Sequence, residues 1–140
     1  MTPLVLDCSA AIALVLPDES SGAVHAAAAK IDSRDRRLLV PSLWWYECTN
    51  AMLTAVRRRR IELAEAREAL SLISRLPHAT HDASSLVDAV HLFHLSTRFT
   101  LTAYDAAYLA LAEVFGATLL TLDRRLSAAA QELSIPTAVT

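Results

Sequence analysis

Short apolar runs alternate with amphipathic segments along this chain, and the alternation predicts a sheet covered by helices. The apolar runs are continuous and do not alternate with polar residues, which is typical of parallel strands buried on both faces. The predicted strands cover residues 3–6, 38–40, 78–81 and 117–122, with a further short candidate at 136–139.

Amphipathic segments with recognisable ends separate these strands. Pro17, Pro77 and Gly116 predict helix ends, and Ser42 and Thr102 are predicted N-caps. The sequence from residue 85 to 88 also has the spacing of a capping box. The predicted helices cover residues 9–16, 20–31, 42–58, 62–76, 85–98, 102–115 and 123–133. We therefore predict an α/β fold, a three-layer α/β/α sandwich around a parallel sheet of four to five strands.

The composition is that of a globular protein. The chain has 140 residues, 54% hydrophobic and 20% charged, so we expect one domain over residues 1–140. The apolar stretch at 4–16 is interrupted by Asp7, and the longer one at 101–122 contains Asp105 and Glu113. These charges argue against a signal sequence or a membrane span, and predict a soluble, cytoplasmic protein without a membrane partner.

Charge is distributed unevenly although the formal net charge is only −2. Lys30 is the one lysine, and every other basic residue is arginine. Four arginines are consecutive: Arg57, Arg58, Arg59 and Arg60. Such a run is either the solvated end of a helix or an edge that contacts phosphate groups, since the guanidinium matches phosphate geometry. The sequence leaves both possibilities open.

Four acidic residues are predicted to meet at one rim of the sheet. Asp7 and Asp123 each follow a predicted strand, Asp105 lies in the first turn of a helix, and Glu47 lies one turn into another. Ligands of open parallel sheets bind beyond the carboxyl ends of the strands, where these residues are expected. Each aspartate also has a simpler possible role: Asp7 and Asp123 as N-caps, and Asp105 as the acidic member of a capping box with Thr102.

Polar neighbours strengthen the prediction of a lined cavity. Glu47, Asn50 and Thr54 are spaced to share one face of a helix that is otherwise mostly apolar, and Ser9 and Thr121 each lie two residues from an aspartate. Converging carboxylates repel one another unless a cation lies between them, and oxygen ligands favour Mg²⁺ or Mn²⁺. A bound divalent ion of this kind suits phosphodiester hydrolysis.

The four acidic segments, in this order and spacing, resemble PIN-domain ribonucleases of the VapC toxin type. The segments are Leu-Val-Leu-Asp at 4–7, Trp-Tyr-Glu-Cys-Thr-Asn at 45–50, Leu-Thr-Ala-Tyr-Asp at 101–105 and Leu-Leu-Thr-Leu-Asp at 119–123. The resemblance covers nearly the whole chain. It implies a PIN-like parallel sheet between helices and endonucleolytic cleavage of RNA that depends on Mg²⁺ or Mn²⁺.

The resemblance also implies roles and partners. Asp7, Asp105 and Asp123 would be metal ligands, and Glu47 would complete the catalytic set. A cognate VapB-type antitoxin would neutralise the enzyme, and a homodimer, with further assembly on the antitoxin, is expected. The arginine run at 57–60 has no counterpart in this pattern, so its role as an RNA-binding edge remains a separate hypothesis.

Alternative functions remain open at this point. The chain can be a solitary PIN nuclease in RNA processing, or a non-catalytic PIN scaffold. His91 and His94 are spaced to share a helix face, where a zinc site is possible, and the simpler interpretation is two surface residues. Cys8 and Cys48 lack metal-ligand spacing and are expected to be small buried side chains.

Overall fold

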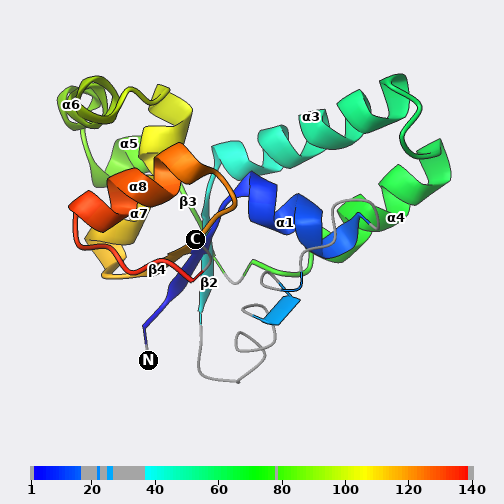
Figure 1. The fold of residues 1–140 in the computed structure, drawn as a ribbon, viewed down its shortest axis with the longest axis horizontal. Helices are drawn as coiled ribbons and strands as arrows, with labels where there is room; N and C mark the ends of the chain where they lie inside the picture. The colour runs from blue at the N-terminus through cyan, green and yellow to red at the C-terminus, as the bar shows by residue number, and fades with distance from the viewer. Residues whose placement is uncertain (1, 17–21, 23–24, 27–36, 78, 139–140) are drawn as a thin grey trace.

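A four-stranded parallel sheet forms the centre of the molecule (Figure 1). The computed structural model describes residues 2–16, 22, 25–26, 37–77 and 79–138. The strands are β1 (Leu4–Leu6), β2 (Leu38–Pro41), β3 (Ala79–His81) and β4 (Thr118–Leu120), in the order β3-β2-β1-β4. Each neighbouring pair is parallel. The four strands predicted between residues 3 and 122 are therefore confirmed.

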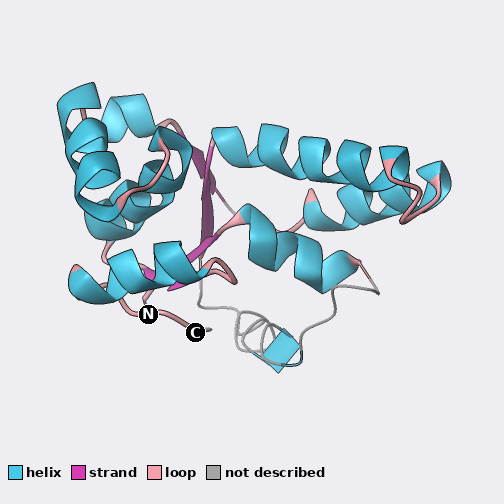
Figure 2. Ribbon diagram, turned by 45° about the horizontal axis from the view of Figure 1, so that its top comes forward, coloured by secondary structure: helices cyan, strands magenta, loops and turns pink. Residues whose placement is uncertain are grey.

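Helices cover both faces of this sheet, as Figures 1 and 2 show. One layer contains α1 (Cys8–Val15), α3 (Leu43–Arg57) and α4 (Leu63–Ile73). The other contains α5 (Ala83–Leu86), α6 (Ala89–Phe99), α7 (Ala103–Phe115) and α8 (Arg124–Glu132). This arrangement confirms the predicted α/β/α sandwich. Of the helices within the described ranges, none is long and apolar enough to span a bilayer.

The core lies where the sheet meets α1, α3 and α7. All three residues of β1 are buried, and Trp44 at the start of α3 is 0% exposed. Helix α7 is buried without interruption from Ala106 to Ala112 and contacts β1, β2 and β4. Its apolar residues extend around the whole helix because it packs against the sheet, α6 and α8 at the same time.

The strand order creates a crevice between the carboxyl ends of β1 and β4. The chain runs from β1 to β2 on one side of β1, and β4 pairs on the opposite side. Where neighbouring strands of a parallel sheet connect to opposite sides, a gap opens beyond their carboxyl ends, and α/β proteins bind ligands in this gap. Asp7 follows β1 directly, and Asp123 follows β4 after a short connection.

The start of α6 departs from the predicted single helix over residues 85–98. Val87 is extended and separates α5 from α6, and Asp88 is the N-cap of α6, where its carboxylate accepts a hydrogen bond from the amide of His91 (2.9 Å). The predicted capping box from Ser85 to Asp88 is therefore wrong. Asp88 does not close a capping box with Ser85 because its own backbone is extended (φ −83°, ψ 170°), which makes it the N-cap of the following helix.

Three other boundaries also differ from the predictions. Ser42 precedes α3 but its side chain makes no capping hydrogen bond. Helix α4 ends at Ile73, before the predicted end at residue 76. In place of a strand at 136–139, Thr137 forms an isolated parallel bridge with Leu119. The helix predicted at 20–31 lies largely outside the described residues.

Candidate active site

Asp7 is a buried carboxylate held from three directions. It is 5% exposed, and its Oδ1 accepts hydrogen bonds from the backbone amide of Ala10 (3.0 Å) and the hydroxyl of Ser9 (2.7 Å). The hydroxyl of Thr121 donates to Oδ2 (2.5 Å). The bond from Ala10 makes Asp7 the N-cap of α1, as the simpler interpretation predicted. Capping fixes the carboxylate at the carboxyl end of β1.

Ser9 and Thr121 connect the ends of β1 and β4 around this carboxylate. The backbone amide of Leu122 donates to Ser9 Oγ (3.0 Å), and the amide of Asp123 donates to Thr121 Oγ1 (3.0 Å). The two hydroxyl oxygens lie 3.5 Å apart. Both hydroxyls accept from backbone amides that follow β4, and both donate to Asp7, so Ser9 and Thr121 are positioning residues for that carboxylate.

Asp123 is also an N-cap. Its Oδ1 accepts hydrogen bonds from the backbone amides of Arg125 (2.9 Å) and Leu126 (3.2 Å) at the start of α8. Among the described residues, no hydrogen bond reaches its second carboxylate oxygen. Capping therefore occupies one oxygen and leaves the other available to a ligand in the crevice.

Asp105 lies at the start of α7, where Thr102 alone provides the cap. Thr102 Oγ1 accepts a hydrogen bond from the backbone amide of Asp105 (3.1 Å). The reciprocal bond of a capping box, from the Thr102 amide to the Asp105 carboxylate, is absent from this described segment. The predicted cap at Thr102 is confirmed, and the Asp105 carboxylate is not used for capping.

Glu47 enters the site from α3 and is paired with a tyrosine. The hydroxyl of Tyr108, which is 2% exposed, donates a hydrogen bond to Glu47 Oε1 (2.7 Å). Burial raises the pKa of Glu47, and the charges of Asp105 and Asp7 raise it further, while the bond from Tyr108 opposes this shift. The other oxygen of Glu47 remains available to the cavity.

All four predicted carboxylates line one cavity of about 310 Å³. Its walls are Asp7, Cys8, Ser9, Ile12, Glu47, Ala51, Asp105, Tyr108 and Asp123. The acidic residues come from the ends of β1 and β4 and from α3 and α7, which are far apart in sequence. No lysine or arginine belongs to this described lining. The cavity therefore concentrates negative charge without a compensating side chain.

Burial and mutual repulsion disfavour full ionisation of the site. Burial raises the pKa of Asp7, and the nearby charge of Asp123 raises it further, against hydrogen bonds from Thr121, Ala10 and Ser9. The pKa of Glu47 is raised in the same direction. A cation in the cavity would reverse this preference because it favours the ionised form of each carboxylate.

The donor set fits a small divalent cation that keeps part of its water shell. Only oxygen donors are offered by the acidic residues, which is the preference of Mg²⁺ and Mn²⁺. Within the described ranges, no three His, Cys, Asp or Glu side chains lie close enough to hold one ion among them. Mg²⁺ commonly binds through one or two carboxylates and several waters, so the cavity needs no closer cluster.

A groove of about 440 Å³ continues from this cavity along α3. Glu47, Asn50 and Thr54 line it as the predicted polar stripe, opposite Cys8, Ile12 and Leu16 of the first helix and its end. It shares Glu47 with the acidic cavity. The supporting residue Asn50 therefore lies beside the acidic site and does not line the acidic cavity itself.

The arginine run lies at the end of α3, where the backbone turns back. All four arginines are exposed. Arg59 has the left-handed φ of 58°, and the amides of Arg59 and Arg60 donate to the carbonyls of Val56 (3.0 Å) and Ala55 (2.9 Å). This turn brings Arg60 to the wall of the groove that contains Glu47. Arg57, Arg58 and Arg59 line neither this groove nor the acidic cavity.

Comparison with known proteins identifies the family. The PIN-domain family model matches residues 4–132.

This chain belongs to the PIN-domain family.

Its relatives include Ribonuclease VapC3 from Pyrobaculum aerophilum, which is 36% identical over 124 residues, 89% of this chain and 92% of the relative. Ribonuclease VapC9 from Mycobacterium tuberculosis is 34% identical over 124 residues, 89% of this chain and 88% of the relative. These matches place the chain among the VapC-type PIN domains, so the resemblance noted in its sequence is confirmed.

Solved structures share the PIN fold. PAE2754 from Pyrobaculum aerophilum has a TM-score of 0.72 at 26% identity, covering 98% of this chain and 84% of that one. VapBC2 from Rickettsia felis, solved bound to a DNA fragment from their promoter, has a TM-score of 0.68 and covers 97% of both chains. The second match is only 10% identical and therefore supports the fold alone.

Tyr108 is the member of this PIN-domain cavity that sequence reasoning did not select. It lies on α7, and the burial of Tyr108 together with the charge of Glu47 raises the pKa of its hydroxyl, so the phenol stays a hydrogen-bond donor. A signal was present, because Tyr108 follows Asp105 by three residues and so shares its helix face. This spacing does not identify a site residue by itself, because a tyrosine in a long apolar helix is most simply explained as part of the hydrophobic core.

The alternative chemistries considered for this PIN domain are not supported. His91 Nε2 lies 3.2 Å from Glu113 Oε1 on α7, and no zinc-ligating group that includes His91 and His94 forms within the described part of the chain. Both cysteines are free; Cys48 is buried as predicted, whereas Cys8 is only partly buried because it also lines the acidic cavity. A hydrogen bond with Cys8 and burial raise the pKa of Cys48, which keeps this thiol protonated and unreactive.

Proposed function

We propose that this PIN domain is a metal-dependent endoribonuclease and the toxin of a toxin–antitoxin pair. The observation that carries the proposal is the acidic cavity, into which four separate elements bring a carboxylate without a basic side chain in its lining. The ribonuclease names of its VapC relatives support RNA as the substrate. The VapC type of these relatives supports a VapB-type antitoxin as the partner, as the resemblance in the sequence implies.

The acidic residues would have two roles, metal binding by the aspartates and proton transfer by Glu47. Asp7 and Asp105 would hold Mg²⁺ or Mn²⁺, Asp123 would join them directly or through a bound water, and Glu47 would complete the catalytic set. When bound, the ion supplies Lewis-acid activation of the phosphate and of the attacking water. Glu47 would accept a proton at Oε2, because Tyr108 occupies Oε1 and the raised pKa of Glu47 suits a proton acceptor.

The other named residues would support substrate and carboxylates. Ser9 and Thr121 keep Asp7 in one orientation through their hydrogen bonds. Asn50 and Arg60 lie in the adjoining groove, where Arg60 would contact an RNA phosphate beyond the cleaved one. Arg57, Arg58 and Arg59, exposed at the same turn, would add a longer-range attraction for RNA that weakens with salt.

Growth arrest provides the test of the toxin role. Expression of the wild-type chain in a bacterial host is expected to stop growth, and co-expression of the antitoxin encoded beside its gene is expected to restore it. Asp105→Asn should not arrest growth, because the Asp105 carboxylate is not needed for the helix cap and its loss removes only site charge. Arrest that persists in Asp105→Asn would show that the acidic cavity is not its cause.

Replacing Tyr108 with phenylalanine tests how Glu47 is positioned. Loss of the hydrogen bond is expected to raise the pKa of Glu47 further, since that bond now lowers it. If cleavage requires ionised Glu47, the acid limb of the pH–rate profile moves to higher pH, and the rate at neutral pH falls by about tenfold or more.

The matched control for this variant is Tyr104→Phe, because Tyr104 lies on the same helix and is 65% exposed. It is expected to keep the wild-type profile. An unshifted acid limb in Tyr108→Phe would remove the assigned role of the Tyr108–Glu47 pair.

A further inference from the structure

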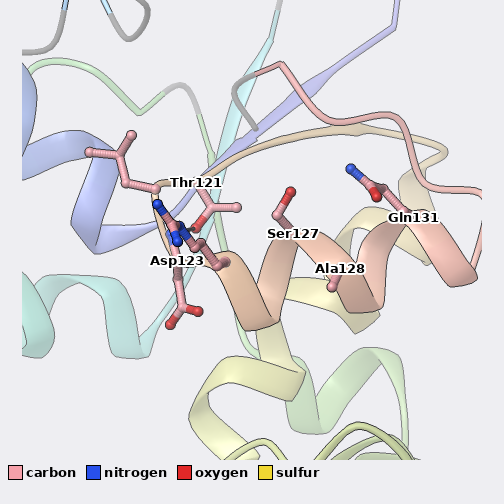
Figure 3. Close-up of a pocket in the computed structure, with 7 residues that line it drawn as sticks. Thr121, Asp123, Ser127, Ala128 and Gln131 are labelled. Atoms are coloured by element: carbon pink, nitrogen blue, oxygen red, sulfur yellow. Dashed lines mark hydrogen bonds between the residues drawn. The ribbon is translucent and has the colours of Figure 1, made fainter.

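A second pocket, which shares Asp123 with the acidic cavity, lies along α8 (Figure 3). Its volume is about 550 Å³, within the range of ligand-binding pockets. It is lined by Thr121, Leu122, Asp123, Arg124, Ser127, Ala128 and Gln131. Thr121 and Asp123 belong to the acidic site as well, so a ligand in this pocket would lie next to the group that reacts.

Ser127 shows that the pocket offers an unused polar group. This residue is 6% exposed, and its hydroxyl has no hydrogen-bond partner among the described residues. Serine in a helix commonly bonds to the carbonyl four residues earlier, but here only the backbone amide of Ser127 bonds to Asp123 (2.9 Å). A buried hydroxyl without a partner is unfavourable, and its position in a pocket wall indicates that a ligand supplies the partner.

Two further polar side chains share the pocket with Ser127. Arg124, Ser127 and Gln131 are spaced along α8 so that they face one side of the helix. Figure 3 shows Ser127 and Gln131 projecting from the same side of α8. Arg124 and Gln131 are both exposed, so they are accessible to a ligand that enters from solvent. The pocket thus combines a cation, a hydroxyl and an amide with the apolar side chains of Leu122 and Ala128.

This combination matches the parts of a nucleotide. A guanidinium binds phosphate, and the start of a helix favours negative charge. A glutamine amide both donates and accepts, which suits the edge of a base, and a hydroxyl suits a ribose or base atom. Sequence-specific recognition of RNA usually reads unpaired bases held out of the stack.

We infer that the α8 pocket binds one unpaired nucleotide of the RNA adjacent to the cleaved phosphate and thereby selects the cleavage site. Arg124 would contact its phosphate, and Ser127 and Gln131 would contact its sugar and base. This inference rests on the proposed ribonuclease function, because it requires the cleaved phosphate to lie in the acidic cavity.

Binding of labelled RNA to a non-cleaving protein tests the inference. The probes are short fluorescent single-stranded homopolymers of A, C, G and U, titrated with Mg²⁺ into Asp105→Asn, whose altered residue is outside the α8 pocket. We expect this protein to prefer one base. Adding Gln131→Ala is expected to reduce that preference by about fivefold or more, the lower end of what a lost base contact costs.

The other two positions have different expected signatures. Arg124→Gln should weaken all four RNAs similarly and lower the salt dependence of binding by about one phosphate contact. Ser127→Ala should weaken the preferred RNA while leaving the melting temperature unchanged or raised, because it removes an unpaired buried hydroxyl. A merely structural serine would instead lose thermal stability when truncated.

Matched controls lie on the same helix outside the pocket. Arg125→Gln and Glu132→Ala alter exposed residues that do not line it, and both should behave as the parent protein does. If the pocket variants match these controls in affinity and base preference, the inference is overturned. Mapping cut positions in cellular RNA then distinguishes failure of the nucleotide-pocket inference from failure of the proposed ribonuclease function. Wild-type cleavage with cut positions unchanged by Gln131→Ala would reject the nucleotide pocket alone, and absence of RNA binding and cleavage would reject the ribonuclease as well.

Discussion

Replacing Asp7 with asparagine is expected to reduce RNA cleavage by about a thousandfold or more while the fold stays intact. Changes to residues that only support a metal ligand typically cost 10- to 100-fold, and loss of a proposed ligand should cost more. Asparagine has nearly the same shape and is a good N-cap, so it can still accept the hydrogen bond from Ala10 that begins α1.

The same substitution should leave the thermal stability of the protein unchanged or increase it, although it removes cleavage. The pKa of Asp7 is raised above its ordinary value of 3.8 by burial, so the folded protein binds this proton more tightly than the unfolded chain does. The stability contributed by this group is therefore complete below that ordinary value and is lost as pH rises through the folded pKa. Without added metal, Asp7→Asn should melt at the wild-type temperature or above it at neutral pH, with the difference shrinking in acid.

Asp88→Asn is the matched control for this variant. Asp88 also caps a helix, by accepting a hydrogen bond from His91, but it lies outside the acidic cavity. Cleavage and melting temperature should both remain close to wild type. Full cleavage by Asp7→Asn, or its failure to fold, would contradict the account given for this carboxylate.

Removal of divalent metal is expected to abolish cleavage, and added Mg²⁺ or Mn²⁺ should restore it. Four carboxylates in one cavity without a basic residue in the lining leave a charge that a cation would neutralise. A ligand that binds only the folded state stabilises it by about 2.7 kcal/mol at a concentration one hundred times its Kd. For a domain of this size that free energy corresponds to a rise in melting temperature of several degrees.

The readout is thermal unfolding with and without Mg²⁺, alongside cleavage before and after chelation. The rise in melting temperature should be present in wild type and in Asp88→Asn, and should be reduced in Asp7→Asn and Asp105→Asn. Cleavage that persists in excess chelator would exclude the metal from the reaction. An equal rise in all four proteins would place the bound ion somewhere other than the acidic cavity.

The sheet and its long helices could be predicted because their signals are local. Continuous apolar runs mark strands buried on both faces, and α7 begins at Thr102 and ends at Gly116, where the cap and the left-handed backbone match the residue types. The convergence of Asp7 and Asp123 followed from one general property of parallel sheets, namely that their carboxyl ends share an edge.

Features that depend on tertiary contacts could not be predicted. The sequence at 85–88 fits a capping box, but Asp88 caps the following helix because its own backbone is extended in the folded chain. Tyr108 has the pattern of a core residue, and only the folded chain brings its hydroxyl on α7 to Glu47 on α3. Arg60 reaches the groove through a turn with left-handed backbone at Arg59, a conformation that the residue type does not suggest.

The α8 pocket also could not be predicted from the sequence. Arg124, Ser127 and Gln131 are ordinary residues of an amphipathic helix, and nothing in their spacing distinguishes a binding face from a solvated one. Their significance comes from the orphaned hydroxyl of Ser127 and from the shared wall with Asp123. Both observations require the folded chain.

The most direct test of the account is Mn²⁺-dependent cleavage of total cellular RNA by the purified protein, compared with Asp105→Asn and with the cut positions mapped. The account predicts discrete cuts by the wild-type protein that disappear in the variant and in excess chelator. Identical cuts by the variant, or no cuts by the wild-type protein, would contradict the claim that the four carboxylates form a ribonuclease site.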